Sequence, residues 1–275
     1  MRIGVVAMSS IGNPEVVAPA SALAAIAYPE VDLTFHPSCF LRAGHFAGTD
    51  EQRAAAFLDY ANDPAIDAIW FLRGGYGSNR ILRAVMPRLN DAARRKSYVG
   101  YSDVGFLLGA LYARGIGRPV HGPMVSDIRR KGGDETVART LGWLARKDRT
   151  ALEPTIRSAS GGHPVAAFNL SILTALIGTP WMPDLAGHVL MIEEVSEAMY
   201  AVDRMLFTMA NATQLKGIAG VRLGDVTDEK VNDPPWGETL EAMMDRWCRD
   251  MGVPYLGRAV IGHTQTNCVV PFGVA

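Results

Sequence analysis

The 275-residue sequence lacks the features that mark several protein classes. No apolar run reaches the ~18 residues that a membrane-spanning helix needs, and the longest, at 16–28, is interrupted by Pro19 and Ser21. Net charge is nearly absent, because 27 Lys and Arg residues against 28 Asp and Glu residues give a formal charge of −1. This balance removes the broad electrostatic argument for nucleic acid or an anionic membrane. We therefore expect no membrane and no nucleic acid among its partners.

Cysteine is scarce and follows no pattern. The three cysteines, Cys39, Cys248 and Cys268, are an odd number and show no C-x-x-C spacing. This argues against a disulfide framework and favours a reducing, cytoplasmic compartment. The six histidines are equally scattered, with no H-x-x-H or H-E-x-x-H pair. We therefore expect no metal site.

What the sequence does contain is ordinary globular composition. Hydrophobic residues make up 48% and charged residues 20%, which excludes intrinsic disorder, and the length predicts one to two domains. Arg2 followed by the apolar residues 3–8 could imitate a signal peptide, but the polar residues 13–15 end the stretch early. A buried first strand is the better interpretation.

The first half alternates short β-rich runs with helical patterns. Apolar runs bounded by turn residues predict strands at 3–8, 31–35, 65–72 and 98–101. Thr49 lies three residues before Gln52, a capping-box spacing that predicts a helix from Asp50. This alternation predicts a mostly parallel sheet covered by helices. In such sheets, sites form outside the carboxyl ends of the strands.

The composition changes after Trp143. Residues 146–162 are polar and include Pro154 and a Ser-Ala-Ser-Gly-Gly run, which is typical of a linker. Beyond it we expect helices at 170–177, 200–211 and 238–251, and β-runs at 188–193, at 217–223, near Val260 and near Val269. The predicted fold is α/β, with a site between two domains. An N-terminal domain (1–148) has a mostly parallel sheet with flanking helices, a linker spans 149–164, and a smaller C-terminal α/β domain spans 165–275.

Ser102 stands where a nucleophile could be exposed. It follows a predicted strand in the GYSD sequence at 100–103, and a helix-like run comes next at 104–112. A serine on such a strand-to-helix turn exposes its hydroxyl beside free N–H groups of the helix start, which could hold an oxyanion. The spacing is not a strict G-x-S-x-G elbow, because position 104 is Val. Helix capping by Ser102 or Asp103 is the alternative.

A glycine-rich turn, Arg73-Gly74-Gly75-Tyr76-Gly77, follows the third predicted strand. Its glycines let backbone approach a ligand closely and expose N–H groups. The spacing matches neither a P-loop nor a dinucleotide-binding fingerprint, and no phosphate-binding lysine follows. A nucleotide-binding regulator is therefore a weak interpretation, and a plain tight turn stays open.

Two later segments supply a carboxylate and a base. Glu193 and Glu194 close a predicted strand, where one carboxylate could orient a histidine. Strand alternation sends their side chains to opposite faces, so only one can do so. His263 follows an apolar run at 259–261 and could act as a general base near neutral pH. A surface glutamate and a structural histidine are the alternatives, but the order Ser102, Glu193, His263 suits a Ser-His-Glu hydrolase.

Short motifs along nearly the whole chain carry a family resemblance. They are FAGTDEQR at 46–53, DAIW at 67–70, RGGYGS at 73–78, GYSD at 100–103, HGPM at 121–124, NLS at 169–171, GTP at 178–180, Glu193-Glu194, Tyr200, Asp203-Arg204, Gly262-His263 and PFG at 271–273. Each motif is weak alone, but their shared order and spacing are specific. The sequence resembles the LD-carboxypeptidase family of serine peptidases, which includes murein tetrapeptide LD-carboxypeptidases and microcin C self-immunity peptidases.

The resemblance implies roles for individual residues. Ser102 matches the family nucleophile, Glu193 the triad acid and His263 the general base. The backbone N–H groups of Gly75 and Asp103 would form the oxyanion hole. The resemblance further implies no metal or organic cofactor, a homodimer, and a cytoplasmic muropeptide as substrate. The cleaved bond would join meso-diaminopimelate to a terminal D-alanine, a step of peptidoglycan recycling.

Substrate-binding residues are less defined. The resemblance makes Arg73, Gly74, Tyr76 and Asn169 candidates, and the Arg73 guanidinium could pair with a carboxylate or only brace the glycine turn.

Two departures from the family pattern leave the substrate open. Thr264 stands where the family often has glycine, and Phe168 falls in Ala-Phe-Asn in place of Gly-Gly-Asn. Phe168 could narrow a pocket, stack on a ligand or pack in the core. One alternative is a microcin C-type peptidase that cleaves peptidyl or aminoacyl nucleotides, with Trp181 or Trp236 stacking on the base. Another is a catalytically silent binding protein on the same scaffold.

Overall fold

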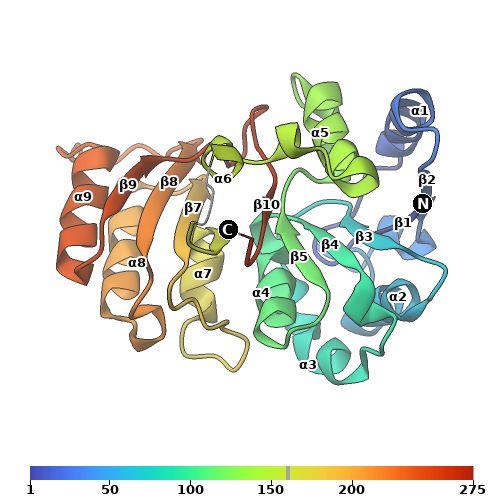
Figure 1. Cartoon of the computed structure of the whole chain (residues 1–275), viewed down its shortest axis with the longest axis horizontal. Coiled ribbons are helices and arrows are strands. Elements are labelled where there is room, and N and C mark those ends of the chain that lie inside the picture. The colour runs from blue at the N-terminus through green and yellow to red at the C-terminus, as the bar shows by residue number, and fades with distance from the viewer. Residues whose placement is uncertain (159–161, 275) are drawn as a thin grey trace.

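Two β-sheets lie side by side, and helices pack against both of them (Figure 1). The computed structural model describes residues 1–158 and 162–274. The larger sheet has six strands in the order β10-β5-β4-β3-β1-β2, and the smaller has four in the order β6-β7-β8-β9. The α/β class predicted from the sequence is confirmed.

Parallel pairing dominates the larger sheet. Its parallel strands are β1 (Arg2–Val6), β2 (Asp32–Phe35), β3 (Ala68–Phe71), β4 (Ser97–Gly100) and β5 (Arg118–His121). The short β10 (Val270–Pro271) pairs antiparallel with β5. The strands predicted in the first half are confirmed with slightly shifted ends. β5 has no predicted counterpart, because Arg118 and Pro119 interrupt its apolar run.

Helices cover both faces of this sheet (Figure 1). One face carries α1 (Val17–Ala27) and α5 (Gly133–Arg146), and the other carries α2 (Asp50–Asn62), α3 (Leu82–Val85) and α4 (Gly105–Ala113). The side chains of β3 show the consequence, since all are buried and successive ones face opposite cores. Ile69 and Phe71 join one core, and Trp70 joins the other. Burial on both faces explains the continuous apolar run of this strand.

The predicted start of α2 is confirmed. The Gln52 N–H donates to Thr49 Oγ1 at 3.3 Å, and the Thr49 N–H donates to Gln52 Oε1 at 2.9 Å. This capping box satisfies two N–H groups that a helix start otherwise leaves unpaired. It fixes the helix to begin at Asp50.

The smaller sheet is wholly parallel. Its strands are β6 (Val165–Asn169), β7 (Val189–Val195), β8 (Gly220–Thr227) and β9 (Tyr255–Arg258), and its helices are α7 (Leu170–Leu176), α8 (Met199–Asn211) and α9 (Leu240–Met251). α8 packs against both α7 and α9. The predicted helices and the first two β-runs of this half are confirmed. The β-run expected near Val260 lies a few residues earlier, as β9, where its pairing with β8 shifts register.

Helices α4 and α7 join the two sheets. Both contribute to one buried hydrophobic cluster, which extends from Phe57 near the first sheet to Met243 near the second. Gly109 permits this close approach, because a Cβ there would lie 3.0 Å from Leu176 Cδ1 and 3.3 Å from Phe168. Phe168 itself is buried, which makes it a core residue.

The segment between the sheets has structure of its own. A short helix, α6 (Pro154–Ser158), follows an isolated bridge between Leu152 and Val269. Residues 159–161 of the expected linker lie outside the described residues. The chain returns near its end, where β10 joins the larger sheet (Figure 1). In the described part of the chain, no helix has the length and apolarity to cross a bilayer.

Candidate active site

A cavity of about 340 Å³ lies where the carboxyl ends of strands from both sheets face each other. The residues around it are Arg73, Gly74, Gly75, Tyr101, Ser102, Met124, Ser126, Asp127, Arg130, Val195 and His263. The glycine turn follows β3, Ser102 follows β4 and Val195 ends β7. The structure thus brings three sequence-predicted segments to one cavity.

Ser102 adopts a backbone conformation that is unusual for serine. Its φ of 59° lies in the left-handed region, which costs a non-glycine residue about 1–3 kcal/mol. It begins a 3₁₀ turn, Ser102–Val104, that leads directly into α4. A strained serine between a strand and a helix start is the arrangement of a nucleophile elbow. The hydroxyl is partly exposed at the cavity.

The glycine turn approaches this serine closely. A Cβ on Gly74 would lie 3.0 Å from both Cβ and Oγ of Ser102, and one on Gly75 would lie 2.0 Å from Ser10 Oγ. Gly75 also has a φ of 118°, which favours glycine. Gly75 is exposed, and its N–H makes no hydrogen bond within the described structure. The turn therefore presents an unpaired backbone donor beside the serine.

The buried Asp103 carboxylate ties the glycine turn to the start of α4. It accepts hydrogen bonds from the N–H groups of Gly77 at 3.2 Å and Ser78 at 2.9 Å, and from the Ser9 hydroxyl. The Ser78 hydroxyl donates to the Asp103 carbonyl at 2.6 Å. Burial raises the pKa of this carboxyl, while the hydrogen bonds act in the opposite direction. The segments that carry the Gly75 and Asp103 amides are thus held together by one side chain.

Glu193 and His263 form a buried pair from β7 and the loop after β9. Glu193 Oε2 lies 2.8 Å from His263 Nδ1, and the two side chains are 0% and 9% exposed. A proton on Nδ1 donates to the carboxylate and leaves Nε2 free to act as a base. Glu194 points to the other face, where it accepts from Asn169 Nδ2 and the Ser171 hydroxyl.

Ser102 and His263 share the cavity without touching. Among the described residues, no hydrogen bond joins the Ser102 hydroxyl to the His263 imidazole. Catalytic hydrogen bonds are often long before a substrate closes the site. The geometry therefore supplies an oriented imidazole and a serine with a strained backbone, both lining one cavity.

Behind His263 lie three further side chains that the sequence did not predict as site residues: Tyr101, Asp127 and Arg130. The Tyr101 ring lies 4.7 Å from the His263 ring, and its hydroxyl donates to Asp127 Oδ1 at 3.1 Å. Arg130 Nε lies 2.9 Å from the same Asp127 oxygen, and Arg130 Nη1 donates to the His263 carbonyl at 2.7 Å. Asp127 and Arg130 closely follow the HGPM motif. The signal that could have located them is an Asp–Arg pair three residues apart just after a strand end.

Two models of known protein families match most of the chain. The LD-carboxypeptidase N-terminal domain matches residues 3–122, and the LD-carboxypeptidase C-terminal domain matches residues 164–275. A Synechocystis protein with a provisional carboxypeptidase name is 32% identical over 237 residues, which cover 84% of this chain and 76% of that protein. The chain belongs to the LD-carboxypeptidase family.

Other relatives agree with this membership. The murein tetrapeptide carboxypeptidase of Pseudomonas aeruginosa is 26% identical over 290 residues, covering 95% of this chain and 91% of that protein. The muramoyltetrapeptide carboxypeptidase of Oxalobacter formigenes shares the fold, with a TM-score of 0.79 at 23% identity over 99% of this chain and 93% of that one. So does the microcin C7 self-immunity protein MccF, solved with glutamyl sulfamoyl guanosine (TM-score 0.76, 20% identity, 99% and 91% covered). Membership supports a carboxypeptidase that acts on murein peptides.

The residues predicted to bind substrate in this LD-carboxypeptidase family member form two groups, those that line the cavity and those that do not. Arg73 and Gly74 line the cavity, but the Arg73 guanidinium donates to the carbonyls of Gly74 at 3.3 Å and Ile11 at 3.2 Å. Tyr76 is half exposed, lies against Phe46 and does not line the cavity. Asn169 caps α7 and donates to Glu194, also away from the cavity.

His121 supports the loop that carries His263. This buried side chain meets Asn267 Oδ1 at 3.3 Å, and the same oxygen accepts the Gly262 N–H at 3.2 Å. Burial lowers the pKa of His121 to about 4, so the imidazole is neutral at pH 7. In the described part of the chain, no cluster of three or more His, Cys, Asp or Glu side chains could hold a metal.

Proposed function

We propose that the protein is a serine-type LD-carboxypeptidase that removes the terminal D-alanine from murein tetrapeptide in the cytoplasm. Ser102 is the nucleophile, His263 the general base and Glu193 the triad acid. The observation that carries the proposal is the 2.8 Å pair of Glu193 and His263 facing a strained Ser102 in one cavity. Family membership supplies the substrate class.

The reaction is acyl transfer through a covalent intermediate. His263 Nε2 takes the Ser102 proton as the hydroxyl attacks the carbonyl of the diaminopimelate residue. The Gly75 and Asp103 N–H groups stabilise the oxyanion, where one donor contributes on the order of 10²–10³ in turnover. His263 then protonates the leaving D-alanine amine, and water hydrolyses the acyl-enzyme. Glu193 holds the imidazole in the required tautomer throughout.

Arg130 is our candidate for the substrate's terminal carboxylate, and Arg73 is the alternative. Both side chains line the cavity, and the Arg73 guanidinium donates from Nε and Nη1 to two backbone carbonyls, which leaves its Nη2 open. Arg130 uses Nε for Asp127 and Nη1 for the His263 carbonyl, which leaves Nη2 for a ligand and ties the guanidinium to the segment that carries the proposed base. Its side chain is 43% exposed. A guanidinium fixed on one edge and open on another is suited to receive a carboxylate.

The nucleotide alternative finds less support. The related MccF structure holds glutamyl sulfamoyl guanosine, and stacking on such a base needs an aromatic wall. Trp181 packs under Arg114 and against the core, and Trp236 also packs against the core. Neither lines the cavity, and the Tyr101 ring already lies tilted against the His263 ring. We therefore prefer a peptide substrate.

The deciding experiment is D-alanine release from L-Ala-γ-D-Glu-meso-diaminopimelate-D-Ala, comparing wild type with Ser102→Ala. Loss of a serine nucleophile lowers turnover on the order of 10⁶-fold, so release by the wild type alone is the expected result. Circular dichroism establishes that both proteins are folded. Equal release by both would overturn the triad. If the folded wild type releases no D-alanine, the tetrapeptide is not the substrate, and the protein is either a peptidase for peptidyl nucleotides or a binding protein without activity.

Size-exclusion chromatography with light scattering tests the proposed homodimer.

A further inference from the structure

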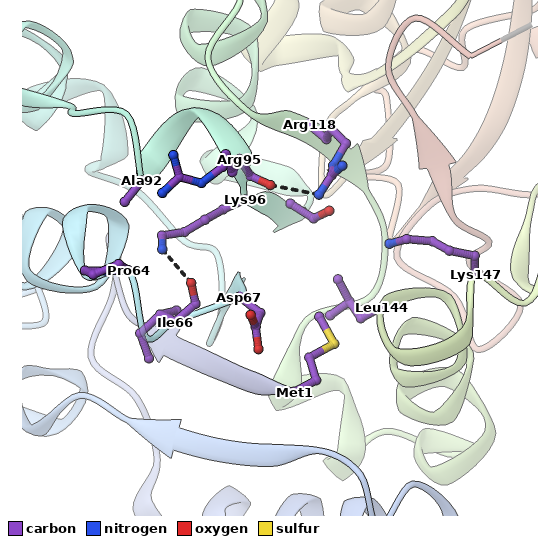
Figure 2. Close-up of a pocket in the computed structure, with 11 residues that line it drawn as sticks. Met1, Pro64, Ile66, Asp67, Ala92, Arg95, Lys96, Arg118, Leu144 and Lys147 are labelled. Carbon is purple, nitrogen blue, oxygen red and sulfur yellow. Dashed lines mark hydrogen bonds between the residues drawn. The ribbon is translucent and has the colours of Figure 1, made fainter.

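A second cavity, of about 510 Å³, lies at the amino-terminal edge of the larger sheet, opposite the edge that carries Ser102. Asp67, Ser97 and Arg118 stand at or just before the starts of β3, β4 and β5, and Lys147 follows the end of α5. Figure 2 shows Asp67, Arg118 and Lys147 around a common space, with the Lys147 ammonium extended toward it. The proposed peptidase reaction uses none of these residues.

Positive charge gathers in this cavity without balancing carboxylates. Its cations are Arg95, Lys96, Arg118 and Lys147, and its one acid is Asp67. Four cations less one carboxylate leave three positive charges in excess. Within the described residues, none of the four cations forms an ion pair. Asp67 itself accepts the Arg2 N–H at 2.7 Å.

Several of these cations are poorly compensated. Burial lowers the pKa of Lys147, and the Arg118 charge lowers it further. Burial also lowers the pKa of Lys96, although the Asp63 and Asp67 charges raise it. Lys96 Nζ donates to the Asp63 carbonyl at 2.6 Å and to the Ile66 carbonyl, as Figure 2 draws for Ile66. Lys96 is buried, whereas Arg95, Arg118 and Lys147 are exposed. A hollow lined by charges of one sign attracts counter-ions of the other sign, here an anion.

The donors on Arg118 and Lys147 are open to such an anion. Arg118 uses Nη2 for the Arg95 carbonyl at 2.8 Å, which leaves its other N–H groups available. Lys147 Nζ lies 5.2 Å from the centre of the Trp143 ring and makes no hydrogen bond within the described structure. Met1, Ile66 and Leu144 also line the cavity and form its apolar wall, with the Asp67 carboxylate among them (Figure 2). The cavity thus combines cationic and apolar side chains.

We propose that this cavity binds a small phosphorylated organic molecule, with its phosphate on Arg118, Lys147 and Arg95. A phosphate monoester carries about −1.5 to −2 charges at pH 7, which matches the excess better than a single carboxylate. Guanidinium forks and ammonium groups are the side chains that recognise phosphate oxygens. The apolar wall receives the organic part of the ligand. This inference is independent of the proposed peptidase activity.

Calorimetric titration of the full chain with phenyl phosphate, at low ionic strength, tests the site. We expect one saturable site, bound more tightly than inorganic phosphate because the ring contacts the apolar wall. Lys147→Gln and Arg118→Gln should each weaken binding about tenfold, as expected for a charged hydrogen bond. Lys216→Gln, at an exposed position near the second sheet, is the matched control and should bind like wild type.

Each other outcome bears on the proposal. Ser102→Ala should bind as wild type does, because the site lies at the other sheet edge; loss of binding in that variant would overturn the location. Undiminished affinity in both cavity variants, or no saturable binding to folded wild type, would overturn the site. Equal affinity for phenyl phosphate and inorganic phosphate would overturn the role of the apolar wall. Lys147→Gln removes no described hydrogen bond, so it keeps the test valid if Arg118→Gln fails to fold.

Discussion

At the scale of single residues, the site depends on side chains whose neighbours restrict them. Ser102 is held at a φ of 59°, and Glu193 is wholly buried with its Oε2 on His263. Sequence order placed these residues at strand ends, and only the family resemblance favoured Glu193 over the adjacent Glu194. In the structure, β7 turns Glu193 toward His263 and Glu194 toward Asn169.

The two glutamates should therefore differ in kind when substituted. Glu193→Gln removes the charge that orients His263, and we expect turnover of tetrapeptide to fall on the order of 10⁴-fold. Glu194→Gln should retain turnover within about tenfold but lower stability by about 1–3 kcal/mol, because Glu194 is buried against Asn169 and Ser171. Steady-state kinetics and urea unfolding measure both. The reverse pattern would show that Glu194 is the triad acid.

Arg130 gives a second prediction at this scale. Arg130→Gln should raise KM for tetrapeptide about tenfold to a hundredfold, because the terminal carboxylate loses a charged partner. The specific readout is a substrate whose terminal D-alanine is amidated. Wild type should discriminate against the amide, and Arg130→Gln should discriminate far less. Arg73→Gln is the matched control and should keep the wild-type preference. If Arg73→Gln alone abolished discrimination, the carboxylate would belong to Arg73.

At the scale of elements, backbone turns decide where the proposed reacting groups lie. The sequence predicted most strands, the capping box of α2 and the glycine turn, because periodicity and turn residues are local signals. It did not predict that Asp103 would join the turn to α4, because that contact spans residues far apart in sequence. Nor did it predict α6 in the expected linker, where Pro154 begins a short helix. Tyr76 belongs to the glycine turn and Asn169 to the NLS motif, but neither side chain lines the cavity.

Gly74→Ala tests the close approach of the glycine turn. Its Cβ would lie 3.0 Å from Cβ and Oγ of Ser102, so the turn must move and carry the Gly75 N–H with it. We expect kcat to fall about 10²-fold, the cost of misplacing one donor, with the fold retained. Gly122→Ala is the control, because its Cβ would make ordinary contacts of 3.4 Å with Val269 and Val99. Equal effects of both substitutions would remove the steric argument.

At the scale of the whole molecule, the proposed catalytic groups come from both halves of the chain. Ser102 follows a strand of the larger sheet, whereas Glu193 lies on the smaller one. The sequence predicted two units but could not show that one hydrophobic cluster runs through α4 and α7 between them. The division at 148 and 164 stays a prediction. The β-run expected near Val269 is confirmed as β10, but its return to the larger sheet was not predicted, because the pairing with β5 joins residues far apart in sequence.

His121 makes the stability of the folded protein depend on pH. It ends β5, pairs with Val270 of β10 and contacts Asn267. Burial lowers its pKa from 6.5 to about 4. Below pH 6.5 the unfolded chain therefore binds a proton that the folded protein does not, so stability falls as the pH drops toward 4. The loss by pH 4.5 is roughly 2–3 kcal/mol from this group.

Urea unfolding at pH 7 and pH 4.5 isolates the contribution of His121. The buried carboxyls of Asp103, Asp127 and Glu194 have raised pKa values and act in the opposite direction, but they are common to wild type and variant. The expected result is that wild type loses roughly 2–3 kcal/mol more than His121→Asn between the two pH values. His163→Asn, at an exposed position, should follow the wild type. Parallel losses in wild type and His121→Asn would mean that His121 takes up its proton equally in the folded and unfolded protein, and that burial does not lower its pKa.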